Sequence, residues 1–313
     1  MKIDLTDTTS SKINSGLVEA RRAIGGLPAG SVLTLIVVAD EESAYDAVQT
    51  ASWATREHSS RILVVIRRTD RNPRSAGTRL DAEIRVGSDA GTGETVLLRL
   101  HGELASQAQS VVLPLLLPDA PVVVWWPENA PENAAKDPLG ALAQRRITDG
   151  RSAESPVEEL RVRAATYTPG DTDLAWTRIT PWRSVLAAAL DQVGHAAVTS
   201  AAVGAPVDDP SAELLSRWLA DRLKVRVERV PSEGACISSV ELVTADGAIR
   251  LGRPQNGTAT LAITGLPDRQ VRLGEREDSE LLAEELRRLD RDDPYADALV
   301  VGRDKDKERS SHV

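Results

Sequence analysis

The sequence predicts an α/β protein made of an N-terminal domain with a mostly parallel sheet and a second, α+β domain with an antiparallel sheet. Two continuous apolar runs, at 31–39 and 62–66, flank a helical segment. Runs without alternation are typical of parallel strands covered on both faces. Between 237 and 273, short strands alternate with turn dipeptides, which is typical of an antiparallel sheet.

Helical spacing and breaker residues predict the remaining elements. In the segment 40–58, Ala44, Val48, Ala51 and Ala54 recur at helical spacing, so this segment is expected to be a helix. Further strands are expected at 80–86, 94–100, 122–126, 196–203 and 225–230. Further helices are expected at 103–116, 137–144, 156–165, 182–191 and 278–291, and another is expected to begin at Asp209-Pro210.

An aspartate or threonine followed by proline begins three of these helices, at Asp137, Thr180 and Asp209. Such a residue caps the first free N–H groups, and proline suits the first helical position. The composition changes at Gly170, where we expect the domain boundary. The expected organisation is therefore a polar lead-in with a short helix (1–30), an N-terminal α/β domain (31–169), a C-terminal α+β domain (170–302) and a disordered charged tail (303–313).

Composition excludes several classes of protein. The chain has 313 residues and a formal net charge of −9, which argues against a general nucleic-acid binder, because such a protein needs a basic face. Hydrophobic residues make up 41% of the chain, enough for proper cores. The most apolar stretch, 111–126, is short and broken by prolines, so we expect no membrane span. The first residues are polar and resemble no signal peptide, so a cytoplasmic protein is expected.

No catalytic signature is found. The single cysteine, Cys236, excludes an internal disulfide, and a buried structural thiol is the favoured interpretation. No strand is followed by a glycine-rich phosphate loop, and no G-x-S-x-G motif is present. Asp171 and Asp173 could share a Mg²⁺ ion, but they follow a turn rather than a hydrophobic strand, so capping and arginine pairing are favoured.

The segments 118–127, 137–149 and 170–183 combine tryptophan, arginine and aspartate to an unusual degree. Tryptophan beside arginine is typical of interface hot spots, because it joins a large rigid apolar area to a fork that binds carboxylates. The alternative is an internal Arg–Asp network under a Trp-lined core, and composition does not separate the two. The candidate partner-binding residues are Trp125, Trp126, Arg145, Arg146, Asp149, Asp171, Asp173, Trp176, Arg178, Trp182 and Arg183.

At these segments the chain resembles the glucose-6-phosphate dehydrogenase assembly protein family (OpcA), and more closely its actinobacterial branch. The stretches that carry the resemblance are 110–127, Asp137-Pro-Leu-Gly140, 144–149, 170–178 and Thr180-Pro-Trp-Arg183. The resemblance implies a non-catalytic partner that binds glucose-6-phosphate dehydrogenase, in the oxidative pentose phosphate pathway, and favours its active oligomer. It implies no catalytic residue, cofactor or metal. Thiol control known in the cyanobacterial branch is not expected with one cysteine.

A different class of function stays open from the residues alone. An Arg/Asp-lined edge of an α/β sheet in the 137–183 region could hold a sugar phosphate or a nucleotide, in an enzyme or a ligand-binding domain. Stabilisation by such a ligand would favour this alternative, whereas co-elution with the dehydrogenase would favour the assembly function.

Overall fold

The structure, a computed structural model, describes residues 1–23, 31–56, 59–68, 77–87, 93–193, 197–254 and 258–310. The chain divides into two compact units. The first contains Met1–Thr148 and Glu277–Asp290, and the second contains Asp149–Arg276 and Arg291–Val313. The two are described separately below.

The strands of the first unit lie in the order β1-β4-β5-β3-β2-β6-β7. Strands β5, β3, β2, β6 and β7 pair in parallel, whereas β4 and β1 add an antiparallel edge. Their bounds are β1 (Lys2–Leu5), β2 (Leu33–Ala39), β3 (Ser60–Arg68), β4 (Arg79–Val86), β5 (Glu94–His101), β6 (Val122–Trp125) and β7 (Arg145–Thr148). The mostly parallel sheet predicted from the apolar runs is therefore confirmed.

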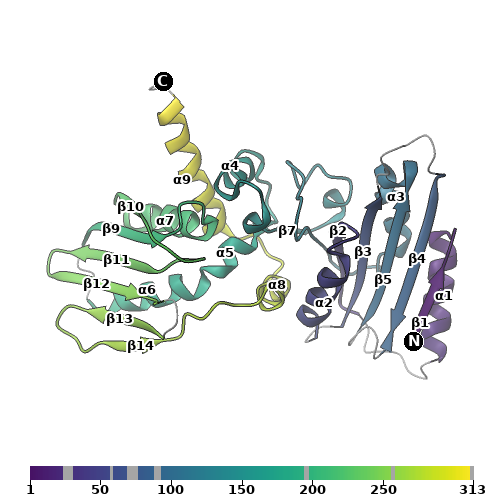
Figure 1. Cartoon of the computed structure of the whole chain (residues 1–313), viewed down its shortest axis with the longest axis horizontal. Coiled ribbons are helices and arrows are strands. Elements are labelled where there is room, and N and C mark those ends of the chain that lie inside the picture. The colour runs from purple at the N-terminus through teal and green to yellow at the C-terminus, as the bar shows by residue number, and fades with distance from the viewer. Residues whose placement is uncertain are drawn as a thin grey trace. The chain divides into compact units, whose positions relative to one another are not determined.

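Helices cover both faces of this sheet (Figure 1). Helix α1 (Ser10–Ala23) lies on one face with α3 (Ala108–Val112), and α2 (Ala44–Ala54) lies on the other with α8 (Asp278–Arg287). Every residue of β2 is buried, as expected for a strand covered on both sides. Helix α1 buries Ile13, Leu17 and Ala20 against the sheet, so one stripe of the helix builds the core.

Three expectations for this unit differ from the structure. Strand β1, within the expected polar lead-in, pairs with β4, and residues 24–30 lie outside the described residues. The expected helix at 103–116 is divided into η2 (Gly102–Gln107), α3 and η3 (Leu113–Leu115). The expected helix at 137–144 is a loop with one short turn, η4 (Gly140–Leu142). Asp137 accepts the backbone N–H groups of Leu139 and Gly140 as a helix cap does, but the backbone is extended again at Ala143, so no helix follows.

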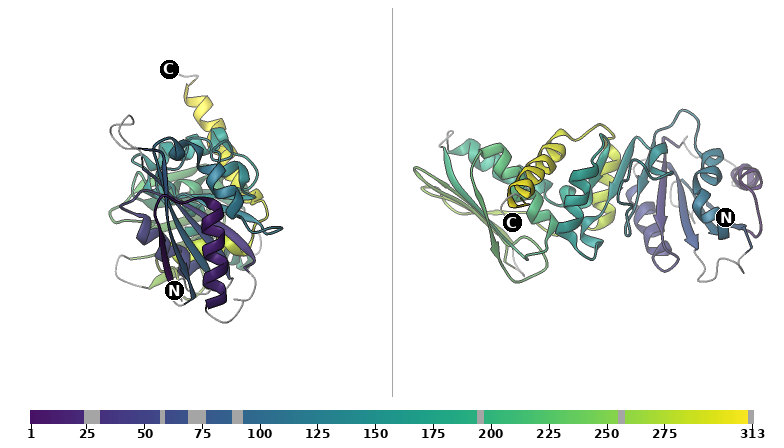
Figure 2. Two further views of the ribbon diagram at one scale, coloured as in Figure 1. Left: turned by 90° about the vertical axis from the view of Figure 1, so that its right-hand side faces the viewer. Right: turned by 90° about the horizontal axis from the view of Figure 1, so that it is seen from above.

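The second unit contains a six-stranded sheet in the order β10-β9-β11-β12-β13-β14. All its pairs are antiparallel except β9 with β10, so the predicted antiparallel character is confirmed. Figure 2 shows helices of this unit on one face of the sheet. The strands are β9 (Val198–Ala205), β10 (Val227–Pro231), β11 (Ser239–Thr244), β12 (Gly247–Gly252), β13 (Ala259–Ile263) and β14 (Arg269–Val271).

The other elements of the second unit carry its core. Tyr295, on the last helix, is buried, and its ring centroid lies 5.8 Å from that of Trp176. Leu160, Trp182 and Leu215, from three further helices, belong to the same cluster. The elements are η5 (Gly150–Ser152), α4 (Pro156–Thr166), β8 (Asp171–Asp173), α5 (Leu174–Arg178), α6 (Thr180–Gln192), α7 (Pro210–Leu223) and α9 (Asp293–Ser310).

The division of the chain differs from the expected one. The first unit ends after Thr148 rather than near 170, because β7, the last strand of that unit, pairs with β6. The chain also returns to the first unit at 277–290, where α8 packs against α2. Helix α9 includes residues 303–310 of the tail that was expected to be disordered, and 311–313 lie outside the described residues.

Candidate functional site

The four tryptophans of the candidate set are buried. Trp125 and Trp126 are 2% and 1% exposed, and Trp176 and Trp182 are 1% and 4% exposed. Burial of an aromatic ring is favourable in itself, so these side chains stabilise their own units. Contact between these four tryptophans and a partner protein stays a prediction. Rings this deeply buried leave little surface area for a partner protein to contact.

The arginines of the first unit in the candidate set make contacts within that unit. Arg145 forms an ion pair with Glu285 of α8 and donates a hydrogen bond to the backbone carbonyl of Asp290 at 2.7 Å. Arg146 donates to the carbonyl of Ala143 at 2.8 Å. Both arginines are buried, and Arg145 therefore joins β7 to the returning α8 segment.

In the second unit, the candidate aspartates cap and join local segments. Asp173 is fully buried; its carboxylate accepts the N–H of Ala175 at 2.8 Å and that of Gly150 at 3.0 Å. Asp171 accepts the N–H of Thr168 at 2.8 Å. Asp173 thus caps the start of α5, as the interpretation favoured by the sequence has it, whereas Asp171 closes a turn. Within the described residues, no group of three or more His, Cys, Asp or Glu side chains is placed to hold a metal ion.

The remaining candidate residues form two pairs. Arg178 binds both carboxylate oxygens of Asp149. The Arg183 guanidinium lies 3.6 Å from the ring centroid of Trp176, a cation–π contact. The Trp176 indole N–H also donates to Asp292 at 2.8 Å. Arginine and tryptophan are therefore neighbours, as the sequence indicates, but they face into the unit.

The exposed aromatic side chains lie elsewhere, on α2. All nine tryptophans and tyrosines are among the described residues, and of these Tyr45 (48%) and Trp53 (51%) are the exposed ones. The Arg56 guanidinium lies 3.1 Å from the Trp53 ring centroid. Tyr45, Gln49 and Trp53 lie along the exposed side of α2, and Arg56 lies just beyond its end; we call these four residues the α2 patch.

Further arginines surround the α2 patch. Arg99 donates to the hydroxyl of Tyr45 at 3.2 Å and pairs with Glu41 at 2.9 Å. Arg85 lies 5.4 Å from the Tyr45 ring centroid. The patch therefore combines exposed aromatic area with cationic groups, the composition of an interface hot spot. Sequence analysis did not select it, although Tyr45 and Trp53 fall opposite the Ala44, Val48 and Ala51 stripe.

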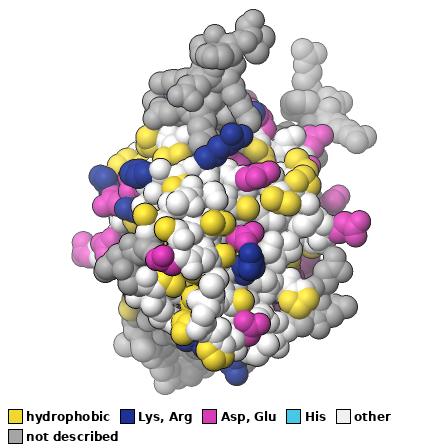
Figure 3. Space-filling view, turned by 90° about the vertical axis from the view of Figure 1, so that its left-hand side faces the viewer, with side chains coloured by type: hydrophobic (Ala, Val, Ile, Leu, Met, Phe, Trp, Pro, Cys, Tyr) yellow, Lys and Arg dark blue, Asp and Glu magenta, His cyan; other side chains and the backbone are white. Residues whose placement is uncertain are grey.

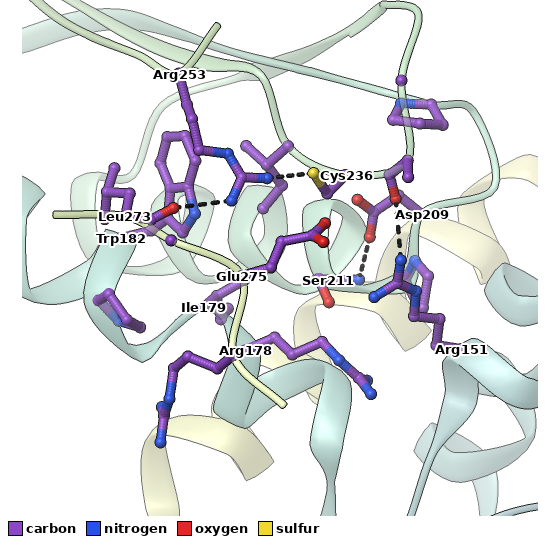
Figure 4. Close-up of a pocket in the computed structure, with 18 of the residues that line it drawn as sticks. Arg151, Arg178, Ile179, Trp182, Asp209, Ser211, Cys236, Arg253, Leu273 and Glu275 are labelled. Atoms are coloured by element: carbon purple, nitrogen blue, oxygen red, sulfur yellow. Dashed lines mark hydrogen bonds between the residues drawn. The ribbon is translucent and has the colours of Figure 1, made fainter. Parts of the chain in front are cut away.

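A cavity of about 240 Å³ lies in the second unit (Figure 4). Six of the residues that line it come from the 137–183 region, among them Arg151, Arg178 and Trp182. Cys236 also lines it and is half-buried, with its sulfur accepting a hydrogen bond from Arg253. Burial and a hydrogen bond with Glu275 raise the pKa of the Cys236 thiol against the opposing effect of Arg253, so the thiol form is favoured.

Charge on the visible surface is mixed. In Figure 3, hydrophobic, acidic and basic side chains are interspersed, and among the coloured atoms of that face no broad basic area is present. No helix in the described part of the chain combines the length and the apolar character that crossing a bilayer requires.

Comparison with family models gives two adjacent matches. Residues 51–165 match the glucose-6-phosphate dehydrogenase subunit N-terminal domain, and residues 169–299 match the C-terminal domain of the same subunit family. The chain belongs to the OpcA family. The family recognised from the Trp- and Arg-containing motifs is thus confirmed.

Solved structures resemble this OpcA-family chain only distantly. UDP-N-acetylglucosamine 3-dehydrogenase GnnA from Acidithiobacillus ferrooxidans is 12% identical, with a TM-score of 0.39 over 86% of this chain and 94% of that one. A probable oxidoreductase, yhhX, is 7% identical, with a TM-score of 0.43 over 87% and 96%. Biliverdin reductase from Synechocystis sp. PCC 6803, solved with biliverdin and NADP+, is 12% identical, with a TM-score of 0.41 over 88% and 97%. Likeness at this level carries no argument about chemistry. The search of curated proteins found no significant match.

The OpcA-family motifs can now be interpreted physically. Asp137-Pro-Leu-Gly140 forms a tight loop in which Asp137 also accepts from Arg67 at 3.3 Å. A Cβ atom on Gly140 would lie 1.8 Å from the carbonyl oxygen of Ala134, so this position requires glycine. The packing of the fold therefore explains the motif at 137–140 as well as binding to a partner does.

Proposed function

We propose that this chain binds glucose-6-phosphate dehydrogenase as a non-catalytic assembly factor and allosteric activator in the oxidative pentose phosphate pathway, in the cytoplasm. Membership of the OpcA family supports the choice of partner. Within the described residues, the candidate aspartates and the single cysteine act in capping and packing, which supports a role without chemistry of its own.

The position of the exposed aromatic side chains indicates which surface of this chain binds the dehydrogenase. Tyr45 and Trp53 both lie in the α2 patch, together with Arg56. Interfaces draw most of their binding energy from a few tryptophan, tyrosine and arginine side chains. We propose that the α2 patch makes the first contact with an acidic, apolar surface of the dehydrogenase. In this proposal, the eleven candidate residues mainly stabilise the folds of the two units.

Activation follows if the chain binds the active oligomer more tightly than the inactive forms. A difference of about 1–3 kcal/mol in binding free energy would shift the oligomer equilibrium about 5- to 150-fold. Because such linkage is reciprocal, the active oligomer would also bind this chain more tightly by the same factor.

The experiment uses purified dehydrogenase, with and without this chain, in size-exclusion chromatography with light scattering and in an NADP+ reduction assay. We expect co-elution, a larger share of the active oligomer and a higher rate. The chain alone, given glucose 6-phosphate and NADP+, is the control and is expected to show no turnover. Separate elution with an unchanged rate would overturn the proposal, and turnover by the chain alone would show an enzyme.

A further inference from the structure

The cavity of the second unit lies where one end of the sheet meets two helix starts. Strand β9, helix α7 and strand β10 form a β–α–β unit with parallel strands. The cavity is lined by Pro206, directly after β9, and by Asp209 and Pro210 at the start of α7. Ligands of α/β proteins bind at this carboxyl edge, because chain turns leave space there and helix N–H groups face it.

One wall of the cavity is apolar. Ile179, Pro181 and Trp182, where α5 leads into α6, line it together with Ile237 and Leu273. The Trp182 ring is held in place, since the residue is only 4% exposed (Figure 4). A volume of about 240 Å³ lies just below the usual range of roughly 300–1,000 Å³ for ligand pockets, so a single ring fits and a dinucleotide does not.

Four arginines line the cavity: Arg151, Arg178, Arg253 and Arg276. Arg253 donates to the carbonyl of Leu273 at 2.8 Å and to the sulfur of Cys236. These two bonds fix the guanidinium and use two of its five N–H groups, and no further acceptor is seen for it in the described part of the chain. The Arg151 side chain makes only a long contact, 3.5 Å, with the carbonyl of Ala235. Arginine with spare donors binds carboxylates and phosphates.

Acidic side chains also line the cavity: Asp208, Asp209 and Glu275. Asp209 receives the N–H groups of Ser211 (2.8 Å) and Ala212 (3.1 Å) on the same oxygen, Oδ1. Within the described residues its other oxygen, Oδ2, has no donor, and Figure 4 shows the carboxylate facing the cavity beside Cys236. Burial raises the pKa of Asp209 against the opposing backbone bonds, so its charged form lacks solvation that a ligand's donor would supply.

We propose that this cavity binds a small cyclic organic anion that carries hydroxyl or amino groups. Its ring would lie against the apolar wall, its carboxylate or phosphate on Arg253 and Arg151, and a donor group on Asp209. The proposal does not depend on binding to the dehydrogenase, because it rests on the geometry of the second unit alone.

Binding is measured on the full chain by titration calorimetry with two probes. One is 4-hydroxybenzoate, a hydroxylated ring with a carboxylate, and the other is ribose 5-phosphate, a polyol ring with a phosphate. Phenol lacks the anion and inorganic phosphate lacks the ring, so both are expected to bind at least about tenfold more weakly than the better probe. The better probe identifies which anionic group the cavity takes.

Cys236 gives a second readout because it is the only cysteine and lines the cavity. A bound probe is expected to slow its alkylation by iodoacetamide in proportion to occupancy. Ala235→Trp places an indole at the cavity lining and is expected to weaken probe binding at least about tenfold. Val207→Trp is the matched control: Val207 is 69% exposed and lies beside the cavity lining without belonging to it.

Charge is tested with Arg151→Gln, which removes a cation that lines the cavity. We expect weaker binding of the anionic probes and unchanged binding of phenol. Arg250→Gln is the control, since Arg250 is exposed and pairs with Glu241 away from the cavity. The proposal is overturned if neither probe binds and protects Cys236, or if the Ala235 and Val207 variants, or the two arginine variants, bind alike.

Discussion

Arg178 donates one hydrogen bond to each carboxylate oxygen of Asp149, and both bonds are 2.7 Å long. Both side chains are largely buried, at 13% and 8% exposed. Asp149 also accepts the backbone N–H of Arg151 at 3.0 Å, so a single carboxylate joins α5 to the η5 turn. A bidentate pair of this kind fixes geometry as well as charge.

Asp149→Asn tests whether this pair is structural. Removing one partner leaves the Arg178 charge buried, so we expect the free energy of unfolding to fall by about 3–5 kcal/mol. Urea denaturation followed by tryptophan fluorescence measures it. Asp268→Asn, at an exposed position in a turn, is the control and is expected to change stability by less than about 0.5 kcal/mol. An Asp149 variant as stable as the wild type would instead return the pair to the list of partner-contact candidates.

Trp53→Ala tests the α2 patch. Because the ring is half exposed and not part of a core cluster, we expect little change in stability but at least about tenfold weaker binding to the dehydrogenase. Surface plasmon resonance with immobilised dehydrogenase measures the affinity. Leu113→Ala removes another exposed apolar side chain, 54% exposed, and is expected to leave binding unchanged. Equal binding by both variants would exclude the α2 patch as the contact.

Glu94 predicts how the first unit responds to acid. Its carboxylate is buried and accepts hydrogen bonds from Arg61, at 3.1 and 3.0 Å, and from Arg21, at 2.8 Å. Burial raises the pKa of Glu94, but the hydrogen bonds and charges of the two arginines outweigh it and leave that pKa below its usual value. A lowered pKa means that this stabilisation is present above the unfolded-state value of 4.5 and is lost as the pH falls through the folded-state value.

Glu94→Gln should therefore cost about 3–5 kcal/mol at pH 7, and the cost should shrink as the pH falls below the unfolded-state value of 4.5. Denaturant unfolding at a series of pH values measures the difference between wild type and variant. Glu241→Gln breaks an exposed pair with Arg250 and is expected to cost less than about 1 kcal/mol at every pH. A difference for Glu94→Gln that does not shrink in acid would contradict the assignment.

Gly140→Ala is expected to destabilise the first unit by about 1–3 kcal/mol, because the added methyl group would press on the backbone of Ala134. Differential scanning calorimetry measures the fall in melting temperature. Gly252→Ala is the matched control, since a Cβ atom there meets nothing within 4 Å. Equal melting temperatures for the two variants would contradict this prediction, because they would show that the close approach at Gly140 does not affect stability.

Local patterns predicted the elements of this protein well where packing and propensity agree. The unbroken run 33–39 became the fully buried β2, and Asp209-Pro210 began α7, with Asp209 accepting two backbone N–H groups as its cap. The antiparallel strands between 239 and 271 followed their turn signals. These features depend on neighbours in the sequence, which is why the sequence alone was sufficient for the fold class.

Long-range contacts decided the rest. Asp137-Pro138 carries the same start signal as Asp209-Pro210, yet the chain there folds into a loop instead of a helix, and Asp137 pairs with Arg67, 70 residues earlier in the sequence. Helix α8 returns to the first unit because its buried face, with Leu281 and Leu282, packs against α2. Neither the loop at Asp137 nor the return of α8 has a local sequence signature, because both depend on residues that come into contact only in the folded chain.

The sequence by itself determined the family, the fold class and the presence of a Trp-, Arg- and Asp-rich region. Only the tertiary structure decided which of these side chains face water. Arg145 forms an ion pair with Glu285, and Trp176 donates a hydrogen bond to Asp292. In each pair the partners are more than a hundred residues apart in the sequence. Trp53, by contrast, stays half exposed. The physical reason is that exposure is a property of all the surfaces that pack together, and no single segment contains that information.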